Sequence, residues 1–355
     1  MIRPLIALSI VVLAAWPARA DVSQGMEAFR RGDYAAALAA WRPLAKGGDP
    51  AAQFNLGILY RRGLGVPPDQ WRAIGWFERA AVRGHPTAQY NLGLIYERGM
   101  GVPPDRAAAL RWYRRAAKPT QGDDGFAKAR ARAQYRLATL LREGDGVNRS
   151  AGMYWMQQAG ENGYAEAQFQ LGLAYAAGKD LPREPAIAAR WFQRAAAQGH
   201  PAAQVNLATL YESGNGLPHD DALAAEWYRK AAEQDVTVAQ INLGSLYAQG
   251  RGVDRDDRAA QGWYRRAADF GAREAFFNLG VLYERSADLK DDREAYFWYA
   301  VAAKAGHRKA GLRLAVLREA IGEGEAGAIE RRAVAWRPPK ARAAPATANT
   351  GRERK

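Results

Sequence analysis

An internal repeat is the feature that most constrains how this chain can fold. The sequence Ala-Gln-Phe-Asn-Leu-Gly at residues 52–57 returns in altered form at six later places. Successive copies are 36, 45, 34, 36, 36 and 36 residues apart, and they begin at Ala52, Ala88, Ala133, Ala167, Ala203, Ala239 and Ala275. A recurring period of this length is typical of repeat proteins, whose units stack on one another. The 355 residues are therefore better interpreted as an array than as two or three separate domains.

Each copy predicts a pair of antiparallel helices. Ala52, Leu56 and Tyr60 are four residues apart, so they share one face of a first helix. Gly57 allows a neighbouring helix to approach closely, and Gly63 suits the left-handed end of a helix. A tryptophan follows each initial alanine by 22 to 24 residues and is expected in the core between stacked units: Trp76, Trp112, Trp155, Trp191, Trp227, Trp263 and Trp298.

A capping residue precedes each of these tryptophans by seven positions. Asp and Asn side chains satisfy free backbone amides at a helix start. Glu184 is a weaker cap, although Pro185 behind it suits the first helical position. The predicted caps of the second helices are Asp69, Asp105, Asn148, Glu184, Asp220, Asp256 and Asp291.

These patterns together resemble the Sel-one-like repeat family, which is related to the tetratricopeptide repeats. The resemblance covers residues 50–307 and rests on Ala-Gln-Tyr-Asn-Leu-Gly-x-x-Tyr, Gly-x-Gly-Val and Trp-Tyr-x-x-Ala-Ala. It implies an all-α fold, a right-handed α-solenoid of antiparallel helix pairs. For function it implies a binding scaffold or adaptor, and members in bacterial envelopes resemble regulators, assembly factors and host-interaction proteins.

Three repeats depart from the common pattern. The spacing into the third repeat is nine residues longer, which predicts a longer loop or a helical extension in residues 118–132, and this insertion is also a candidate for a site of its own. The fourth repeat has Gly178-Lys179-Asp180 and the seventh has Ser286-Ala287-Asp288 where others have Gly-x-Gly. Altered hairpin loops are expected at both places.

The segments outside the repeats have separate predicted roles. Residues 1–20 carry Arg3, an apolar run from Leu5 to Trp16 and Ala18-Arg19-Ala20, the layout of a secretory signal peptide cleaved near Ala20. The apolar run is shorter than the roughly 20 residues that cross a bilayer. We expect a helical capping unit at 21–49, capping helices at 308–335 and a basic disordered tail at 336–355. The predicted location is the periplasm or the outside of the cell.

The charge of the chain is strongly basic. The formal net charge of +14 becomes +7 over residues 21–336, once the signal peptide and the tail are set aside. Because an exported protein rarely meets nucleic acid, we expect acidic protein partners or anionic envelope surfaces, with a simple solvated basic face as the alternative. The sequence does not predict an oligomeric state.

The sequence offers little support for catalysis. It has no cysteine, which excludes disulfides and thiolate metal sites. Three of its four histidines, His85, His200 and His307, follow a glycine in equivalent turns between repeats, and no serine begins a known acylase motif. We therefore predict a non-enzyme with no cofactor and no metal site. The alternative is a peptidoglycan-associated hydrolase or a glycan-binding protein.

A partner-binding groove is predicted by analogy with tetratricopeptide superhelices, in which the first helix of each pair lines the concave face. Aromatic side chains bordered by arginine suit an extended or helical peptide that carries acidic residues. The alternative is that the aromatic residues pack against the adjoining repeat. The predicted partner-binding residues are Phe54, Tyr90, Tyr135, Phe169 and Phe277, with Arg61, Arg62, Arg98, Arg142 and Arg285.

Overall fold

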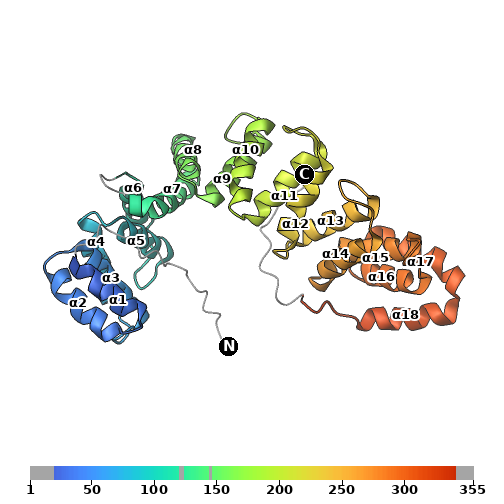
Figure 1. The fold of residues 1–355 in the computed structure, drawn as a ribbon, viewed down its shortest axis with the longest axis horizontal. Coiled ribbons are helices and arrows are strands. Elements are labelled where there is room, and N and C mark those ends of the chain that lie inside the picture. Colours follow the sequence, from blue (N-terminus) through green and yellow to red (C-terminus); the bar gives the residue numbers. More distant parts are fainter. Residues whose placement is uncertain (1–19, 120–123, 144–145, 341–355) are drawn as a thin grey trace. The chain divides into compact units, whose positions relative to one another are not determined.

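The computed structural model describes residues 20–119, 124–143 and 146–340 (Figure 1). These residues form eighteen α-helices and one short 3-10 helix, and none of them forms a strand. The predicted signal peptide lies outside the described residues except for Ala20, where the first helix begins. The chain divides into two compact units, residues 1–182 and 183–355, and each is described by itself.

Unit 1 consists of consecutive helices that pack against their neighbours along the chain (Figure 1). Its helices are α1 (Ala20–Arg30), α2 (Tyr34–Lys46), α3 (Pro50–Arg62), α4 (Gln70–Val82), α5 (Pro86–Arg98), α6 (Arg106–Ala116), η1 (Asp124–Phe126), α7 (Ala127–Arg142), α8 (Gly146–Glu161) and α9 (Ala165–Ala177). Most helices that are separated by one other helix in the chain have few contacts with each other. Helices α5 and α7 are an exception and contact each other directly.

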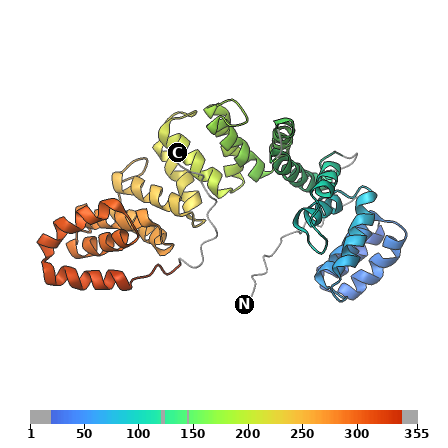
Figure 2. The same cartoon turned by 180° about the vertical axis from the view of Figure 1, so that it is seen from behind.

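Unit 2 continues the same alternation, and both views show its helices as successive hairpins (Figures 1 and 2). Its helices are α10 (Pro185–Ala197), α11 (Pro201–Ser213), α12 (Asp221–Ala232), α13 (Thr237–Gln249), α14 (Asp257–Asp269), α15 (Arg273–Arg285), α16 (Asp292–Lys304), α17 (Arg308–Ile321) and α18 (Glu323–Ala335). The last helix, α18, lies mainly along α16 rather than along α17.

The repeat glycine sets the distance between the two helices of a hairpin. A Cβ atom on Gly57 would lie 2.5 Å from the ring of Phe77, and one on Gly93 would lie 2.4 Å from the ring of Tyr113. These aromatic residues directly follow the repeat tryptophans and are fully buried. The close approach predicted for Gly57 is therefore confirmed, and its partner is the residue after the tryptophan.

The second glycine of Gly-x-Gly joins one repeat to the preceding one. Gly250 ends α13 with a left-handed φ of 66°, as predicted for the first glycine. Gly252 also has a positive φ, 67°, and a Cβ atom on it would lie 2.1 Å from the carbonyl carbon of Asp221 at the start of α12. This loop therefore touches the backbone of the preceding repeat, a contact that a larger residue would prevent.

Five of the seven predicted helix caps are confirmed, and two are wrong. Asp69, Asp105, Asp220 and Asp256 each accept a hydrogen bond from the backbone N–H three residues later. Asp291 does the same for α16. Glu184 makes no side-chain cap, so its prediction as a weaker cap is wrong, although Pro185 does hold the first helical position. Asn148 is not a cap, because α8 begins two residues earlier at Gly146.

The repeat tryptophans are less buried than predicted. Trp191 and Trp298 are buried, but the other five are only partly covered. Basic side chains three residues later lie over several of these rings, with Arg79 4.6 Å from the centre of Trp76 and Lys230 4.0 Å from that of Trp227. The indole ring therefore lies at the boundary between the core and the solvent. Its exposed face takes part in a cation–π contact.

The three departures from the repeat pattern have different structural results. In the insertion before the third repeat, η1 and an early start of α7 form a helical extension, and buried Phe126 packs edge-on against His85. Asp180 replaces the second glycine with a φ of 69° and forms an ion pair with Arg142. Ser286 ends α15 with extended backbone, and its hydroxyl accepts hydrogen bonds from two later backbone amides. The altered loops are confirmed.

Further helices flank the repeats on both sides. Helices α1 and α2 form a hairpin around fully buried Trp41, and α17 and α18 follow the seventh repeat. Trp336 packs against Phe276 and Trp298, and the backbone N–H of Lys340 donates to the carbonyl of Asp269, so the beginning of the predicted tail lies against unit 2. The rest of the tail lies outside the described residues. Among the described helices, none has the length and apolar character needed to cross a membrane.

Candidate partner-binding surface

Three tyrosines and two arginines form the strongest candidate surface in unit 1. Tyr90 lies on α5, Tyr135 on α7, and Tyr164 directly before α9. The rings of Tyr135 and Tyr164 are 5.1 Å apart, and all three tyrosines are partly exposed. Arg98 at the end of α5 and Arg132 on α7 act electrostatically on Tyr90. We call Tyr90, Tyr135, Tyr164, Arg98 and Arg132 the tyrosine–arginine surface.

The tyrosine–arginine surface has unused hydrogen-bonding and charge capacity. Within the described residues, the hydroxyls of its three tyrosines have no hydrogen-bond partner, and Arg98 and Arg132 have no ion pair. Two neighbouring arginines differ in this respect. Arg136 forms an ion pair with Glu97, and Arg142 lies 2.9 Å from a carboxylate oxygen of Asp180. The two unpaired guanidinium groups are therefore the cations that this surface can offer to an anion.

Burial and charge act in opposite directions on these tyrosines. Partial burial raises the pKa of Tyr90, and the positive charges of Arg132, Arg136 and Arg98 oppose that rise. The pKa of Tyr135 is also raised, mainly by burial. Both hydroxyls therefore stay protonated at neutral pH and can donate hydrogen bonds to a carboxylate or a carbonyl oxygen.

The predicted partner-binding residues are divided between the two units. Tyr90, Tyr135, Arg98 and Arg142 lie close together in unit 1, whereas Phe277 and Arg285 belong to unit 2. Phe54 is buried against Phe77 and stacks on His85 with ring centres 4.6 Å apart.

Phe277, which is partly buried, stacks on His307 at 4.1 Å and packs against Tyr299. Packing within and between neighbouring repeats therefore accounts for Phe54 and contributes to the position of Phe277. Phe169 on α9 is partly buried, Arg62 is exposed, and Arg61 is partly buried.

A polar network recurs where one repeat meets the next. We number positions from the repeat alanine, so that the repeat Asn is at position three and the last turn of the first helix includes position nine. Glu97 at position nine accepts a hydrogen bond of 2.5 Å from Tyr113, and position three of the next repeat, Arg136, donates to the same carboxylate at 3.1 Å. The carboxylate thus joins three helices: α5, α6 and α7.

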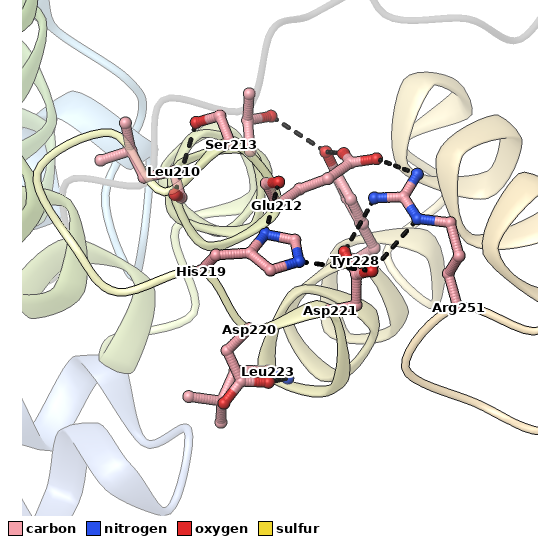
Figure 3. Close-up of polar contacts among 10 residues, drawn as sticks. Leu210, Glu212, Ser213, His219, Asp220, Asp221, Leu223, Tyr228 and Arg251 are labelled. Atoms are coloured by element: carbon pink, nitrogen blue, oxygen red, sulfur yellow. Dashed lines mark hydrogen bonds and ion pairs between the residues drawn. The ribbon is translucent and has the colours of Figure 1, made fainter.

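The same network appears twice in unit 2. Glu284 at position nine accepts hydrogen bonds from Tyr299 at 2.7 Å and from Arg313 at 3.1 Å. Glu212 accepts one from Tyr228 at 2.9 Å, and here Arg251, from the loop after α13, donates at 3.1 Å (Figure 3).

Arg251 connects Glu212 with the beginning of α12. Figure 3 shows its guanidinium between Glu212 and Asp221, and it donates to both oxygens of Asp221 at 2.8 and 3.1 Å. These hydrogen bonds raise the pKa of Arg251. The exposed side chain of His219 lies 3.6 Å from Asp221 and 2.9 Å from the backbone oxygen of Glu212. Each charged side chain of this cluster has a partner within unit 2, so the cluster stabilises the stack of repeats.

The histidines have structural positions, as predicted for three of them. His85 and His200 cap α5 and α11, each accepting a hydrogen bond of 3.2 Å from a backbone N–H, and His307 precedes α17. Complete burial lowers the pKa of His85 to about 3. The described residues contain no group of three or more His, Asp or Glu side chains placed to hold a metal ion.

Sequence reasoning missed Arg132, Arg136 and Tyr164. The repeat pattern contained a signal for Arg136, because it stands at position three where most repeats have Asn. Tyr164 lies at the turn before α9, where two repeats have His, so the same turn position indicated it. Arg132 directly precedes the repeat alanine, and no regularity at that position marked it.

These observations define a class of protein, the all-α helical repeat solenoid. The sequence pattern of the Sel1 repeat family matches residues 50–85, 86–118, 131–164, 165–200, 201–236, 237–269 and 274–307. The chain therefore belongs to the Sel1 repeat family, and the predicted resemblance is confirmed. Sel1 repeat proteins generally serve as scaffolds for protein–protein interactions, and their fold is typically not catalytic.

Several solved structures resemble this chain. A Sel1 repeat protein from Oxalobacter formigenes is 29% identical, with a TM-score of 0.56, and the match covers 70% of this chain and 97% of that one. A protective antigen of uropathogenic Escherichia coli is 25% identical over 94% of this chain and 89% of its own, with a TM-score of 0.39. An immunity protein from Pseudomonas aeruginosa is 19% identical over 60% and 82%, with a TM-score of 0.37. No curated protein matches the chain.

Proposed function

We propose that this chain is an exported interaction scaffold whose tyrosine–arginine surface binds a protein partner that carries acidic side chains. The observation that carries this proposal is that, among the residues the structure describes, Arg98 and Arg132 have no ion pair and the three tyrosine hydroxyls have no hydrogen-bond partner. Arginine and tyrosine are enriched among the residues that dominate binding energy at protein interfaces. Carboxylates suit this combination, because they accept hydrogen bonds from both guanidinium and hydroxyl groups.

The distribution of charge supports an acidic partner. Residues 21–182 contain 22 Lys and Arg against 15 Asp and Glu, whereas residues 183–336 contain 21 of each. The basic excess of the repeat region therefore belongs wholly to the part of the sequence that carries the tyrosine–arginine surface. A positive potential of this kind speeds the encounter with an acidic partner and weakens as salt increases.

Site-specific photocrosslinking tests the proposed surface. A photoreactive amino acid is placed at Tyr90 and, as a matched control, at Val205, which occupies the same repeat position in unit 2. Crosslinking is carried out in the cells that make the protein. We expect Tyr90 to give one recurring protein adduct that Val205 does not give. The adduct should disappear in the double variant R98Q/R132Q.

Two results would contradict the proposal. Equal adducts from Tyr90 and Val205 would show that the tyrosine–arginine surface has no special role. Glycan fragments without any protein at the Tyr90 position would instead support the alternative of a glycan-binding or peptidoglycan-associated protein.

Export is proposed from residues 1–20 and is tested separately. Arg3, the apolar run and Ala18-Arg19-Ala20 predict cleavage near Ala20. We expect mass spectrometry of the periplasmic or secreted fraction to give a chain that begins at Asp21. A chain that keeps residues 1–20 and stays with the cytosolic fraction would contradict the location while leaving the binding surface unaffected.

A further inference from the structure

We propose that the junction between the first and second repeats is a subsite for a carboxylate of the bound partner, with Arg61 as the cation and Asn91 as a hydrogen-bond donor. This inference rests on the proposed binding of an acidic partner and adds a second point of contact. It assigns a role to Arg61 that differs from that of its exposed neighbour Arg62.

The repeat register assigns Arg61 and Asn91 to positions that meet in other junctions. In two of those junctions, the residue at position nine contacts the residue at the position equivalent to three in the next first helix. Arg136 donates to Glu97 at 3.1 Å, and Arg313 donates to Glu284 at 3.1 Å. Arg61 and Asn91 hold these two positions in the first junction. By the same register, we infer that Arg61 on α3 faces Asn91 on α5.

The first junction lacks the carboxylate that Glu97, Glu212 and Glu284 supply at position nine of the second, fifth and seventh repeats. Elsewhere the carboxylate of Glu97 or Glu284 lies between a tyrosine hydroxyl and an arginine. In the first junction, Phe77 replaces the tyrosine and Arg61 replaces the glutamate. The junction therefore keeps a cation and loses the anion. The third repeat shows what an arginine at position nine does when an acid is available, because Arg142 pairs with Asp180 at 2.9 Å.

Unpartnered polar atoms mark the same place. Asn91 is 1% exposed, and within the described residues neither its Nδ2 nor its Oδ1 atom has a hydrogen-bond partner. Thr87, one turn earlier on the same face of α5, is 2% exposed, and its hydroxyl also lacks a partner. Buried polar groups without partners are rare because they are costly.

Arg61 is the partly exposed cation that the register assigns to this junction. Its side chain is partly buried and has no ion pair within the described residues. Burial, with a contribution from the charge of Arg62, lowers the pKa of Arg61. A carboxylate that pairs with Arg61 would relieve this unfavourable burial of charge and could accept a hydrogen bond from the Asn91 amide or the Thr87 hydroxyl.

The test uses a fluorescein-labelled hexaglutamate peptide as the probe and measures its dissociation constant by fluorescence anisotropy. Arg61→Gln is compared with Arg62→Gln, which removes the same charge from the next residue of the same helix. We expect R61Q to weaken binding roughly tenfold and R62Q less than about twofold, because a direct charge-assisted hydrogen bond is lost only in R61Q. Equal effects of the two variants would overturn the subsite, since they would reflect net charge alone.

A second variant separates binding from folding. Asn91→Asp places a carboxylate opposite Arg61 and imitates the Arg136–Glu97 pair in reverse. We expect it to weaken peptide binding as much as R61Q does while leaving the melting temperature unchanged or higher. Unchanged peptide binding in a folded N91D protein would contradict the subsite.

The outcomes also distinguish this inference from the proposed function. If R98Q/R132Q weakens binding and R61Q does not, the subsite is wrong and the tyrosine–arginine surface remains. If the wild-type chain binds neither hexaglutamate nor a longer acidic peptide, both proposals fail.

Discussion

Arg136 of α7 and Glu97 of α5 form an ion pair that joins two consecutive repeats, at a position where most repeats have asparagine. Tyr113 of α6 donates to the same carboxylate at 2.5 Å, so one glutamate connects three helices. In the corresponding place of unit 2, Asn242 hydrogen-bonds to the hydroxyl of Tyr228. Different polar residues therefore make the contact between consecutive repeats in the two units.

Removing the shared carboxylate should destabilise unit 1. We expect Glu97→Ala to lower the free energy of unfolding by about 2–3 kcal/mol, because it removes the counter-ion of Arg136 and the carboxylate that accepts from the Tyr113 hydroxyl. The double variant E97A/R136N should lose less than the sum of its single changes, since Asn is the usual residue at position three. Urea denaturation measures these energies. Strictly additive losses would show that the two side chains are not coupled.

The second glycine of a Gly-x-Gly loop should be intolerant of a side chain. Gly252→Ala would place a Cβ atom 2.1 Å from the backbone of Asp221 at a positive φ, so we expect a loss of about 2 kcal/mol or more. Gly262 is the matched control, because it lies within α14 and a Cβ atom there would meet nothing within 4 Å. Gly262→Ala should stabilise the protein by about 0.5–1 kcal/mol. Thermal denaturation with equal effects in both variants would contradict this account.

His85 should make the stability of the protein depend on pH. Its folded-state pKa of about 3 lies below the ordinary value of 6.5, so the unfolded chain binds the proton more readily. Its contribution is therefore complete above pH 6.5 and decreases as the pH falls toward 3. Between pH 6.5 and about pH 4 the loss is roughly 3 kcal/mol.

The variant His85→Asn tests this contribution, because Asn keeps a cap acceptor and does not titrate. Its free energy of unfolding should fall less steeply with acid than that of the wild type. Parallel pH profiles for H85N and the wild type would contradict the assignment.

Much of the fold could be predicted from the sequence, because seven imperfect copies reveal which residues are structural. The helix pairs, the first-helix glycine and most caps follow from spacing alone. The tryptophans were expected to be more buried, since period and hydrophobicity do not show which of two adjacent aromatic residues points inward. Phe77 and Tyr113 take the buried position opposite the repeat glycine, and the preceding tryptophans lie at the edge of the core.

The candidate surface was only partly predictable. Tyr90, Tyr135 and Arg98 could be identified from their equivalent repeat positions. Arg132 and Tyr164 could not be grouped with them, because their proximity depends on how α5, α7 and the turn before α9 pack together. Sequence alone also could not separate Arg98, which keeps its charge unpaired, from Arg142, which is neutralised by Asp180 at 2.9 Å.

The binding of an acidic peptide to matched double variants tests the central claim most directly. R98Q/R132Q removes two charges from the tyrosine–arginine surface, and R190Q/R258Q removes two exposed charges from unit 2. Anisotropy titrations with labelled hexaglutamate should show affinity that decreases with added salt and is weakened roughly tenfold or more by R98Q/R132Q. R190Q/R258Q should change it less than about twofold. Equal weakening by the two variants, or wild-type affinity in R98Q/R132Q, would contradict the claim that this surface binds an acidic partner.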